Sequence, residues 1–359
     1  MSHPLQRAAS LALAYPWTTT PLIISAPMRV MAGPALAVAV SSAGGLGFLG
    51  PNTKTDNMAS DLEEASALLS TLRSTPNIAL PPSTTSTTLP IGIGFQLWSD
   101  SLLTALKLIK QHKPTATWLF APANGQKDLD VWTRAIRETQ PETKIWIQIG
   151  TVSEAESLIA ASSEKPDVIV IQGSEAGGHG RASDGMGLMA LLPEIVDIVS
   201  PSGIPVVAAG GIADGRGASA ALCLGASGVV LGTRFLASTE ARINPGYQAE
   251  VVRARDGATS TTRTLLYNHL RGTYGWPQEY SPRGVVNRSW TEFCAGRPFD
   301  ELKSEHDRAL GEGEKGWGVE GRLATYAGAA VGLVRGVKGA GEIVEEVREE
   351  VGRLLGSSV

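Results

Sequence analysis

Short apolar runs, rich in β-branched residues, recur eight times before residue 233 and alternate with amphipathic stretches. This alternation is typical of βαβ units in a parallel sheet that is buried on both faces. Eight parallel strands joined by right-handed crossovers close most simply into a barrel. A doubly wound open sheet is the structural alternative. We therefore predict an α/β chain that folds as a (β/α)₈ TIM barrel.

The boundaries of the expected elements follow from the apolar runs and from the helical spacing between them. The expected strands are Leu22–Ala26, Gly45–Leu49, Ile91–Phe95, Thr115–Phe120, Lys144–Ile149, Asp167–Ile171, Pro205–Ala209 and Gly228–Gly232. The expected helices are Ala35–Ser42, Asp56–Arg73, Ser99–Gln111, Asp128–Glu138, Ser153–Ala161, Leu188–Val199 and Asp214–Leu224. The stretch Pro76–Pro90 is rich in Pro, Ser and Thr, which predicts an exposed loop.

The alternation stops after Phe235, and the rest of the chain divides into two further parts. We predict a barrel over residues 1–236, an elaboration near the barrel mouth over 237–317, and C-terminal helices that pack back on the barrel over 318–359. The two helices expected there are Val319–Arg335 and Ala340–Leu355, the latter with apolar residues at helical spacing.

Composition narrows the class of ligand and the compartment. Hydrophobic residues make up 43% and charged residues 18% of the chain, the balance of a globular protein. A net charge of −4 offers no basic surface for nucleic acid, so we expect small-molecule ligands. No apolar run reaches membrane-spanning length, and we expect a cytoplasmic protein without membrane contact. The sequence is also compatible with a homodimer.

Two glycine motifs follow the last two predicted strands. Gly210-Gly211 ends one strand and precedes a helix, and Gly232-Thr233 ends the next. Glycines let the backbone approach an anion, and the free amides supply its binding site. Barrels often hold phosphate after their final two strands, so the pair predicts a phosphate site. We expect Arg234 to form a surface salt bridge outside this site.

A third glycine loop follows the sixth predicted strand and carries a histidine, His179, in Gly177-Gly178-His179-Gly180. Imidazole titrates near neutrality, so it can remove and return a proton, and we predict His179 as a catalytic base. Nearby Glu175 fits a capping role better than metal binding, and we expect no metal site. The surroundings of the other four histidines favour the protein surface: His3, His112, His269 and His306.

Residues at the ends of three other strands complete the predicted site. Pro27 and Met28 would present backbone and a polarisable side chain to a flat aromatic ligand. Gln96 and Gln148 have amide groups that match the edge of a flavin ring, or they satisfy neighbouring backbone instead.

These motifs, in this order, resemble the nitronate monooxygenase family, formerly the 2-nitropropane dioxygenases. The resemblance extends from about Pro21 to Ala237 and is most specific in the glycine loop. The matching segments are Ala-Pro-Met at 26–28, Ala-Gly-Gly-Leu-Gly at 43–47, Gln-Gly-Ser-Glu-Ala-Gly-Gly-His-Gly at 172–180, Ala-Ala-Gly-Gly-Ile-Ala-Asp-Gly at 208–215 and Leu-Gly-Thr-Arg-Phe at 231–235.

The resemblance implies an FMN-dependent barrel enzyme in which His179 is the catalytic histidine. It places the FMN phosphate at Gly210, Gly211, Gly232 and Thr233. It places the ring and ribityl chain along Pro27, Met28, Gln96, Gln172, Gly177 and Gly178. The implied reaction converts a nitronate or nitroalkane and O₂ into a carbonyl compound and nitrite. The sequence departs from the family pattern at two positions. Gln96 stands where asparagine is common in relatives. Gly180 follows His179, so the basic residue Arg181 comes one position later than in the family pattern.

Two other functions fit the same sequence. The first is an NAD(P)H-dependent FMN reductase that acts on an enoyl or quinone substrate, because the same barrel and glycine motifs serve such enzymes. The second is a flavin-free barrel that binds phosphate, either an isomerase or a sensor.

Overall fold

The computed structural model describes residues 4–73, 88–160 and 164–356, and most of the predicted loop Pro76–Pro90 lies outside them. Eight parallel strands form a closed barrel, which confirms the predicted fold class. The order around the barrel is β1 (Leu22–Ser25), β2 (Leu46–Leu49), β3 (Leu89–Gln96), β4 (Pro114–Phe120), β5 (Lys144–Ile149), β6 (Val168–Gln172), β8 (Val206–Ala209) and β9 (Gly228–Leu231). Each agrees with a predicted strand to within two residues.

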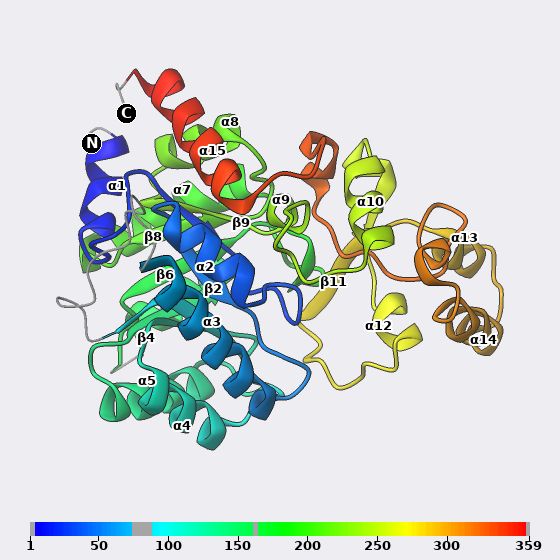
Figure 1. Ribbon diagram of the computed structural model, residues 1–359, viewed down its shortest axis with the longest axis horizontal. Coiled ribbons are helices and arrows are strands. Elements are labelled where there is room, and N and C mark those ends of the chain that lie inside the picture. Colours follow the sequence, from blue (N-terminus) through cyan, green and yellow to red (C-terminus); the bar gives the residue numbers. More distant parts are fainter. Residues whose placement is uncertain (1–3, 74–87, 161–163, 357–359) are drawn as a thin grey trace.

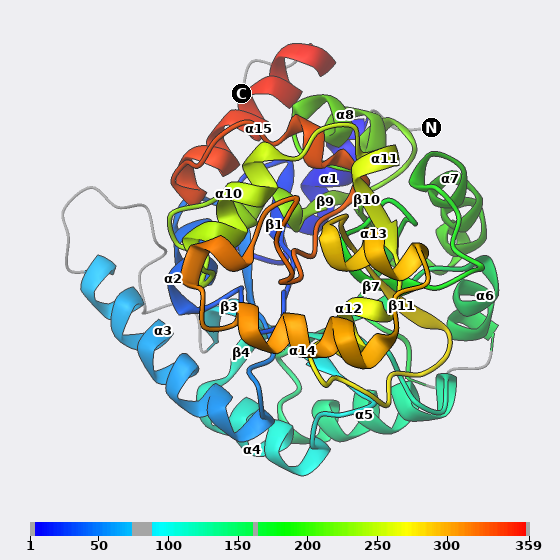
Figure 2. The ribbon, with the colours of Figure 1, turned by 90° about the vertical axis from the view of Figure 1, so that its right-hand side faces the viewer.

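Helices surround the barrel, and Figure 2 shows them as a ring viewed along the barrel axis. They are α2 (Pro34–Ser42), α3 (Met58–Arg73), α4 (Leu102–His112), α5 (Gln126–Thr139), α6 (Val152–Ala160), α7 (Leu188–Val199), α8 (Gly215–Cys223) and the short α9 (Thr233–Leu236). A further helix, α1 (Pro4–Ala12), precedes the first strand.

The C-terminal helix α15 (Ala340–Leu355) fills the gap in this ring that the short α9 leaves. It packs against α8 and α2, as Figures 1 and 2 both show. Arg348 donates hydrogen bonds to the carbonyls of Ala43 and Gly44, and Glu350 accepts one from the Gly215 N–H. The last segment of the chain therefore completes the barrel wall.

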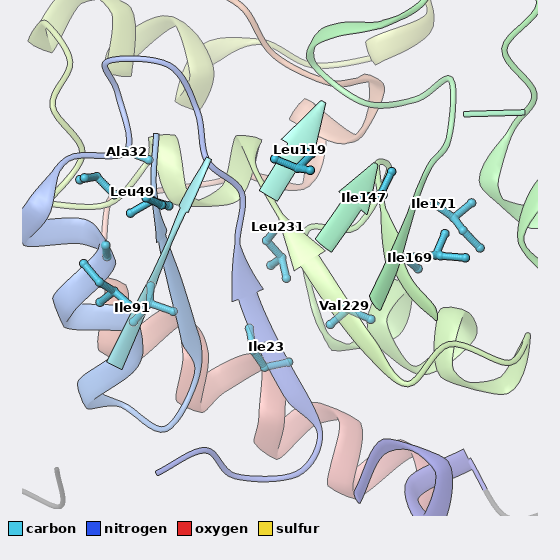
Figure 3. Close-up of a cluster of buried hydrophobic side chains, with 14 of the residues drawn as sticks. Ile23, Ala32, Leu49, Ile91, Leu119, Ile147, Ile169, Ile171, Val229 and Leu231 are labelled. Atoms are coloured by element: carbon cyan, nitrogen blue, oxygen red, sulfur yellow. The ribbon is translucent and has the colours of Figure 1, made fainter. Parts of the chain in front are cut away.

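Two hydrophobic layers follow from the alternation of side chains along the strands. In β5, Ile145 and Ile147 point outward to the helices, whereas Trp146 points into the barrel. Figure 3 shows part of the outer layer, including Ile147 and Val229. Inside the barrel, the Trp146 indole donates a 2.8 Å hydrogen bond to the hydroxyl of Tyr15, and both side chains are buried.

The segment after the barrel is more regular than its sequence indicates. It contains α10 (Pro245–Arg253), α11 (Gly257–Ser260), α12 (Leu266–Leu270), α13 (Arg288–Cys294) and α14 (Phe299–Ala309), together with β10 (Thr261–Arg263) and β11 (Tyr280–Val285). β10 pairs antiparallel with β11, and β11 pairs antiparallel with β7 (Gly178–Arg181), which is the glycine loop of the histidine motif. Figure 2 shows α10, α12, α13 and α14 in front of the barrel mouth.

The predicted helix Val319–Arg335 is wrong. The structure has only a 3₁₀ segment, Ala329–Leu333, within this range. Glycines make a continuous helix unfavourable here, and the extended backbone has other partners. Val285 N–H donates to the Thr325 carbonyl, and Ala329 N–H donates to the Glu175 carbonyl. The segment thus lies between the elaboration and the glycine loop. Among the described residues, none of the helices combines the length and apolar character needed to cross a membrane.

Candidate active site

A cavity of about 810 Å³ opens at the carboxyl ends of the barrel strands. Its walls come from the βα loops below and from the elaboration above. Every residue predicted for the site lines it: Pro27, Met28, Gln96, Gln148, Gln172, Gly177, Gly178, His179, Gly210, Gly211, Gly232 and Thr233. The structure therefore brings all the predicted site residues together.

Strand geometry explains why three glutamines reach this cavity. In β5, Gln148 lies two residues after the inward Trp146, so it points to the same side of the strand. Gln172 bears the same relation to the inward Val170. Gln96 follows the outward Phe95 and so points inward at the end of β3. The three amides consequently meet at the barrel mouth.

The orientation of two of these amides is fixed by neighbours that can only donate hydrogen bonds. The Trp118 indole N–H donates to Gln148 Oε1 at 2.9 Å. Arg29 Nη1 donates to Gln96 Oε1 at 2.8 Å. Since the oxygens are occupied, both glutamines retain NH₂ groups for a ligand. Gln172 has the opposite orientation: its Nε2 donates to the His179 carbonyl at 3.1 Å, which leaves its Oε1 to accept from a ligand.

The glycine motifs form a cradle with unused hydrogen-bond donors. Gly210 and Gly211 have φ values of +96° and +74°, a conformation that favours glycine. In the described part of the chain, the N–H groups of Gly211, Ile212 and Thr233 have no acceptor. The Thr233 hydroxyl accepts from Gly328 N–H at 2.9 Å, which leaves its own proton to donate. These groups fit a phosphate.

His179 is held on β7 between the barrel and the elaboration. Its backbone pairs with Pro282 of β11, and the preceding Gly178 has a φ of +65°. Its ring stacks on the Trp276 indole, with 3.5 Å between centroids and 5° between planes. The Asn268 amide nitrogen lies 2.8 Å from His179 Nε2. The imidazole is therefore fixed on one face and at one nitrogen.

The electrostatic setting of His179 opposes a positive charge. Burial lowers its pKa from 6.5 to about 3, and the cations Arg263, Arg271 and Arg29 act in the same direction. The hydrogen bond with Asn268 offsets part of this change. His179 is accordingly neutral at physiological pH.

Comparison with known proteins places the chain in a family. Residues 12–73 and 131–273, more than half of the chain, match the sequence model of the family described as nitronate monooxygenase. The chain belongs to the nitronate monooxygenase family. It is therefore an oxidoreductase.

Relatives of this nitronate monooxygenase family member match it over almost its whole length. Nitronate monooxygenase npaC of Metarhizium robertsii is 57% identical over 350 residues, which is 98% of this chain and 96% of the relative. Nitronate monooxygenase of Neurospora crassa is 35% identical over 353 residues, 94% of this chain and 90% of the relative. Among solved structures, FabK from Thermotoga maritima is 27% identical with a TM-score of 0.67, and 93% of each chain is covered.

For three side chains near the site, the structure overturns two expectations and agrees with one. Arg234 is buried and donates to the carbonyls of Ala237 and Gly336, so the expected surface salt bridge is wrong. His306 is 2% exposed and lines the cavity, so its expected surface position is wrong as well. Glu175 caps α7 as expected, because its carboxylate accepts the Leu188 N–H.

Four further residues at the site of this nitronate monooxygenase family member were not predicted from the sequence to belong to it. Asn268, Trp276 and Tyr326 surround His179 but come from the segments in which we recognised no periodicity or expected a helix. Arg263 binds the glycine loop through the carbonyls of Ser174, Ala176 and Gly178. The aromatic residues near Trp276-Pro277 were the available signal, but nothing in the sequence connects them to His179.

Proposed function

We propose that the enzyme uses FMN to oxidise alkyl nitronates and nitroalkanes with O₂ to a carbonyl compound and nitrite. One observation carries the proposal. A single cavity joins a phosphate cradle, inward amides and the His179 imidazole in a chain of the nitronate monooxygenase family. The substrate is a small molecule that shares the cavity with the cofactor.

The residues in the cavity suit FMN. The cradle of Gly210, Gly211, Gly232 and Thr233 would hold its phosphate, with free amides as donors. The NH₂ groups of Gln96 and Gln148 would donate to acceptors on the ring edge, and Gln172 Oε1 would accept. Pro27, Met28, Gly177 and Gly178 would line the remainder. Bound FMN would supply the electron transfer between substrate and O₂.

His179 would meet the reacting carbon or the nitro group. With a neutral nitroalkane it would accept the α-proton, and with a nitronate, which is already an anion, it would assist without taking a proton. Because its pKa is lowered to about 3, His179 is a weak base in the resting protein. This favours the nitronate as the better substrate of the two.

The competing function is an NAD(P)H-dependent FMN reductase of enoyl or quinone compounds. The similarity to FabK at 27% identity shows that this architecture is not confined to proteins named nitronate monooxygenase. Substrate choice must therefore be tested directly.

The deciding experiment mixes the FMN-loaded enzyme anaerobically with ethylnitronate, nitroethane, NADH or NADPH and follows flavin absorbance. We expect rapid bleaching with ethylnitronate and none with the nicotinamides. Rapid bleaching by NADH or NADPH alone would reverse the assignment. A protein without flavin absorbance after reconstitution would remove both functions.

A pair of variants tests the role of His179 in turnover. His179→Asn should retain flavin and lose turnover of nitroethane. His269→Asn is the matched control, because His269 stacks on Tyr274 and does not line the cavity. Unchanged nitroethane turnover in His179→Asn would refute the proton-accepting role.

A further inference from the structure

A row of three side chains, Arg271, Tyr326 and Asn268, leads to His179. Arg271, directly after α12, lies beside Tyr326, with its guanidinium carbon 5.4 Å from the Tyr326 ring centroid. The Tyr326 hydroxyl lies 2.8 Å from Asn268 Oδ1. Asn268 Nδ2 lies 2.8 Å from His179 Nε2. Asn268 is 1% exposed and Tyr326 9%.

The direction of this row is set at its outer end. The positive charge of Arg271 next to Tyr326 favours the orientation in which the phenol proton points away from the cation. Among the described residues, its acceptor is Asn268 Oδ1. A reversed Asn268 amide would turn an N–H group toward the Tyr326 hydroxyl and leave the phenol proton without that acceptor. The amide therefore presents its NH₂ group to His179.

We propose that Arg271, Tyr326 and Asn268 fix His179 as the neutral imidazole that carries its proton on Nδ1. Nε2 accepts from the Asn268 amide, so a proton placed on Nε2 would face an N–H group instead of an acceptor. Asn268 and Tyr326 are thus positioning residues, which act on the reaction through His179.

Other groups around His179 support the neutral form. Of the charged groups in the described part of the chain, those with the largest effect on it are Arg263 on β10, Arg271 after α12 and Arg29 after β1, and all three are cations. The Trp276 ring covers one face of the imidazole and excludes water there. Burial and these cations lower the pKa of His179, in agreement with a nitrogen that is held unprotonated.

A direct test reads the tautomer by NMR. Holoenzyme labelled with [¹⁵N]histidine gives long-range ¹H–¹⁵N correlations that distinguish the two neutral tautomers from imidazolium, and His179→Gln assigns the signal. We expect His179 to show the Nδ1–H pattern from pH 8 to pH 5. An Nε2–H pattern, or a protonated ring at pH 7, would overturn the proposal.

Two variants test the residues that impose this state. Tyr326→Phe keeps the ring and removes the hydroxyl that orients the amide, so we expect a mixture of His179 tautomers. Asn268→Asp places an acceptor against Nε2, so we expect a proton there and a rise of about 1–3 units in the pKa of His179. An unchanged Nδ1–H pattern in Tyr326→Phe would show that the row does not orient His179.

A control variant shows whether a change in the His179 signals is specific to the Tyr326 hydroxyl. Tyr247→Phe removes a hydroxyl that donates to the Tyr326 backbone carbonyl at 2.8 Å, and it should leave the His179 signals in place. If Asn268→Asp does not fold, Tyr326→Phe, which removes one oxygen atom, still decides. The tautomer is measured without substrate, so failure of nitronate oxidation and failure of this proposal are separate results.

Discussion

Gly232→Ala should separate FMN binding from stability. A Cβ at Gly232 would lie 3.7 Å from Ala26 Cβ and 3.8 Å from Met28 Sδ, both ordinary contacts. Its φ of −107° is open to alanine. The unfolded state loses freedom with alanine, so the free energy of unfolding of the FMN-free protein should stay level or rise by roughly 0.4–1 kcal/mol.

The same methyl group would occupy the predicted phosphate cradle. Losing one charge-assisted hydrogen bond to the phosphate costs about 1.5–3 kcal/mol, which corresponds to a roughly 10- to 150-fold rise in the Kd for FMN. Quenching of FMN fluorescence on titration with FMN-free protein measures the Kd, and urea unfolding measures the stability.

Gly203→Ala is the matched control for this pair of effects. Gly203 has a φ of +72°, and a Cβ added to it would meet no other atom within 4 Å. It precedes β8, at the opposite end of the barrel from the cavity. The variant should lose about 1–2 kcal/mol of stability through backbone strain and bind FMN normally. Wild-type FMN affinity in Gly232→Ala would refute the location of the phosphate.

Two further perturbations test the core and the histidine. Tyr15→Phe removes the hydroxyl that accepts from Trp146 inside the barrel, so the buried indole N–H loses its partner. The free energy of unfolding, measured in urea, should fall by about 1–3 kcal/mol. An unchanged unfolding midpoint would contradict this. The pKa of His179 is about 3 in the folded protein against 6.5 in the unfolded chain. Between pH 3 and pH 6.5 the unfolded chain therefore binds more protons, and the free energy of unfolding falls as the pH falls through this range. In the FMN-free protein, His179 should account for a loss of about 2 kcal/mol from pH 7 to pH 5. His179→Asn should lack this part of the pH dependence, and identical pH profiles would show that the pKa is not lowered.

The barrel could be predicted from sequence because its determinants are local. The outward Ile145 and Ile147 alternate with the inward Trp146 within a single strand, and this period is visible without any tertiary contact. The glycines at 210, 211 and 232 could be found for a similar reason, since each follows a recognisable strand. Parallel strands then bring their carboxyl ends to one mouth, which is why all the predicted site residues meet in one cavity.

The prediction of a helix over 319–335 failed because distant partners determine the conformation of this segment. Its alanines and valines are compatible with a helix, but the backbone of Thr325 and Ala329 bonds to β11 and to the glycine loop. Gly328 also lies against Gly177, where a Cβ on Gly177 would come within 2.4 Å of the Gly328 nitrogen. Close backbone packing of this kind uses glycine for its size, and a single sequence gives no partner for it.

The surroundings of His179 show where sequence reasoning reaches its limit for function. The residue type and its glycine loop identify a group able to transfer protons, but its protonation depends on neighbours far along the chain. Asn268 is 89 residues from His179, and Tyr326 is a further 58 residues from Asn268. Burial and the neighbouring arginines lower the pKa of His179, and we propose that Asn268 and Tyr326 decide which of its nitrogens stays free. The sequence alone therefore favours a base at position 179, whereas the low pKa of His179 in the folded chain favours a neutral imidazole.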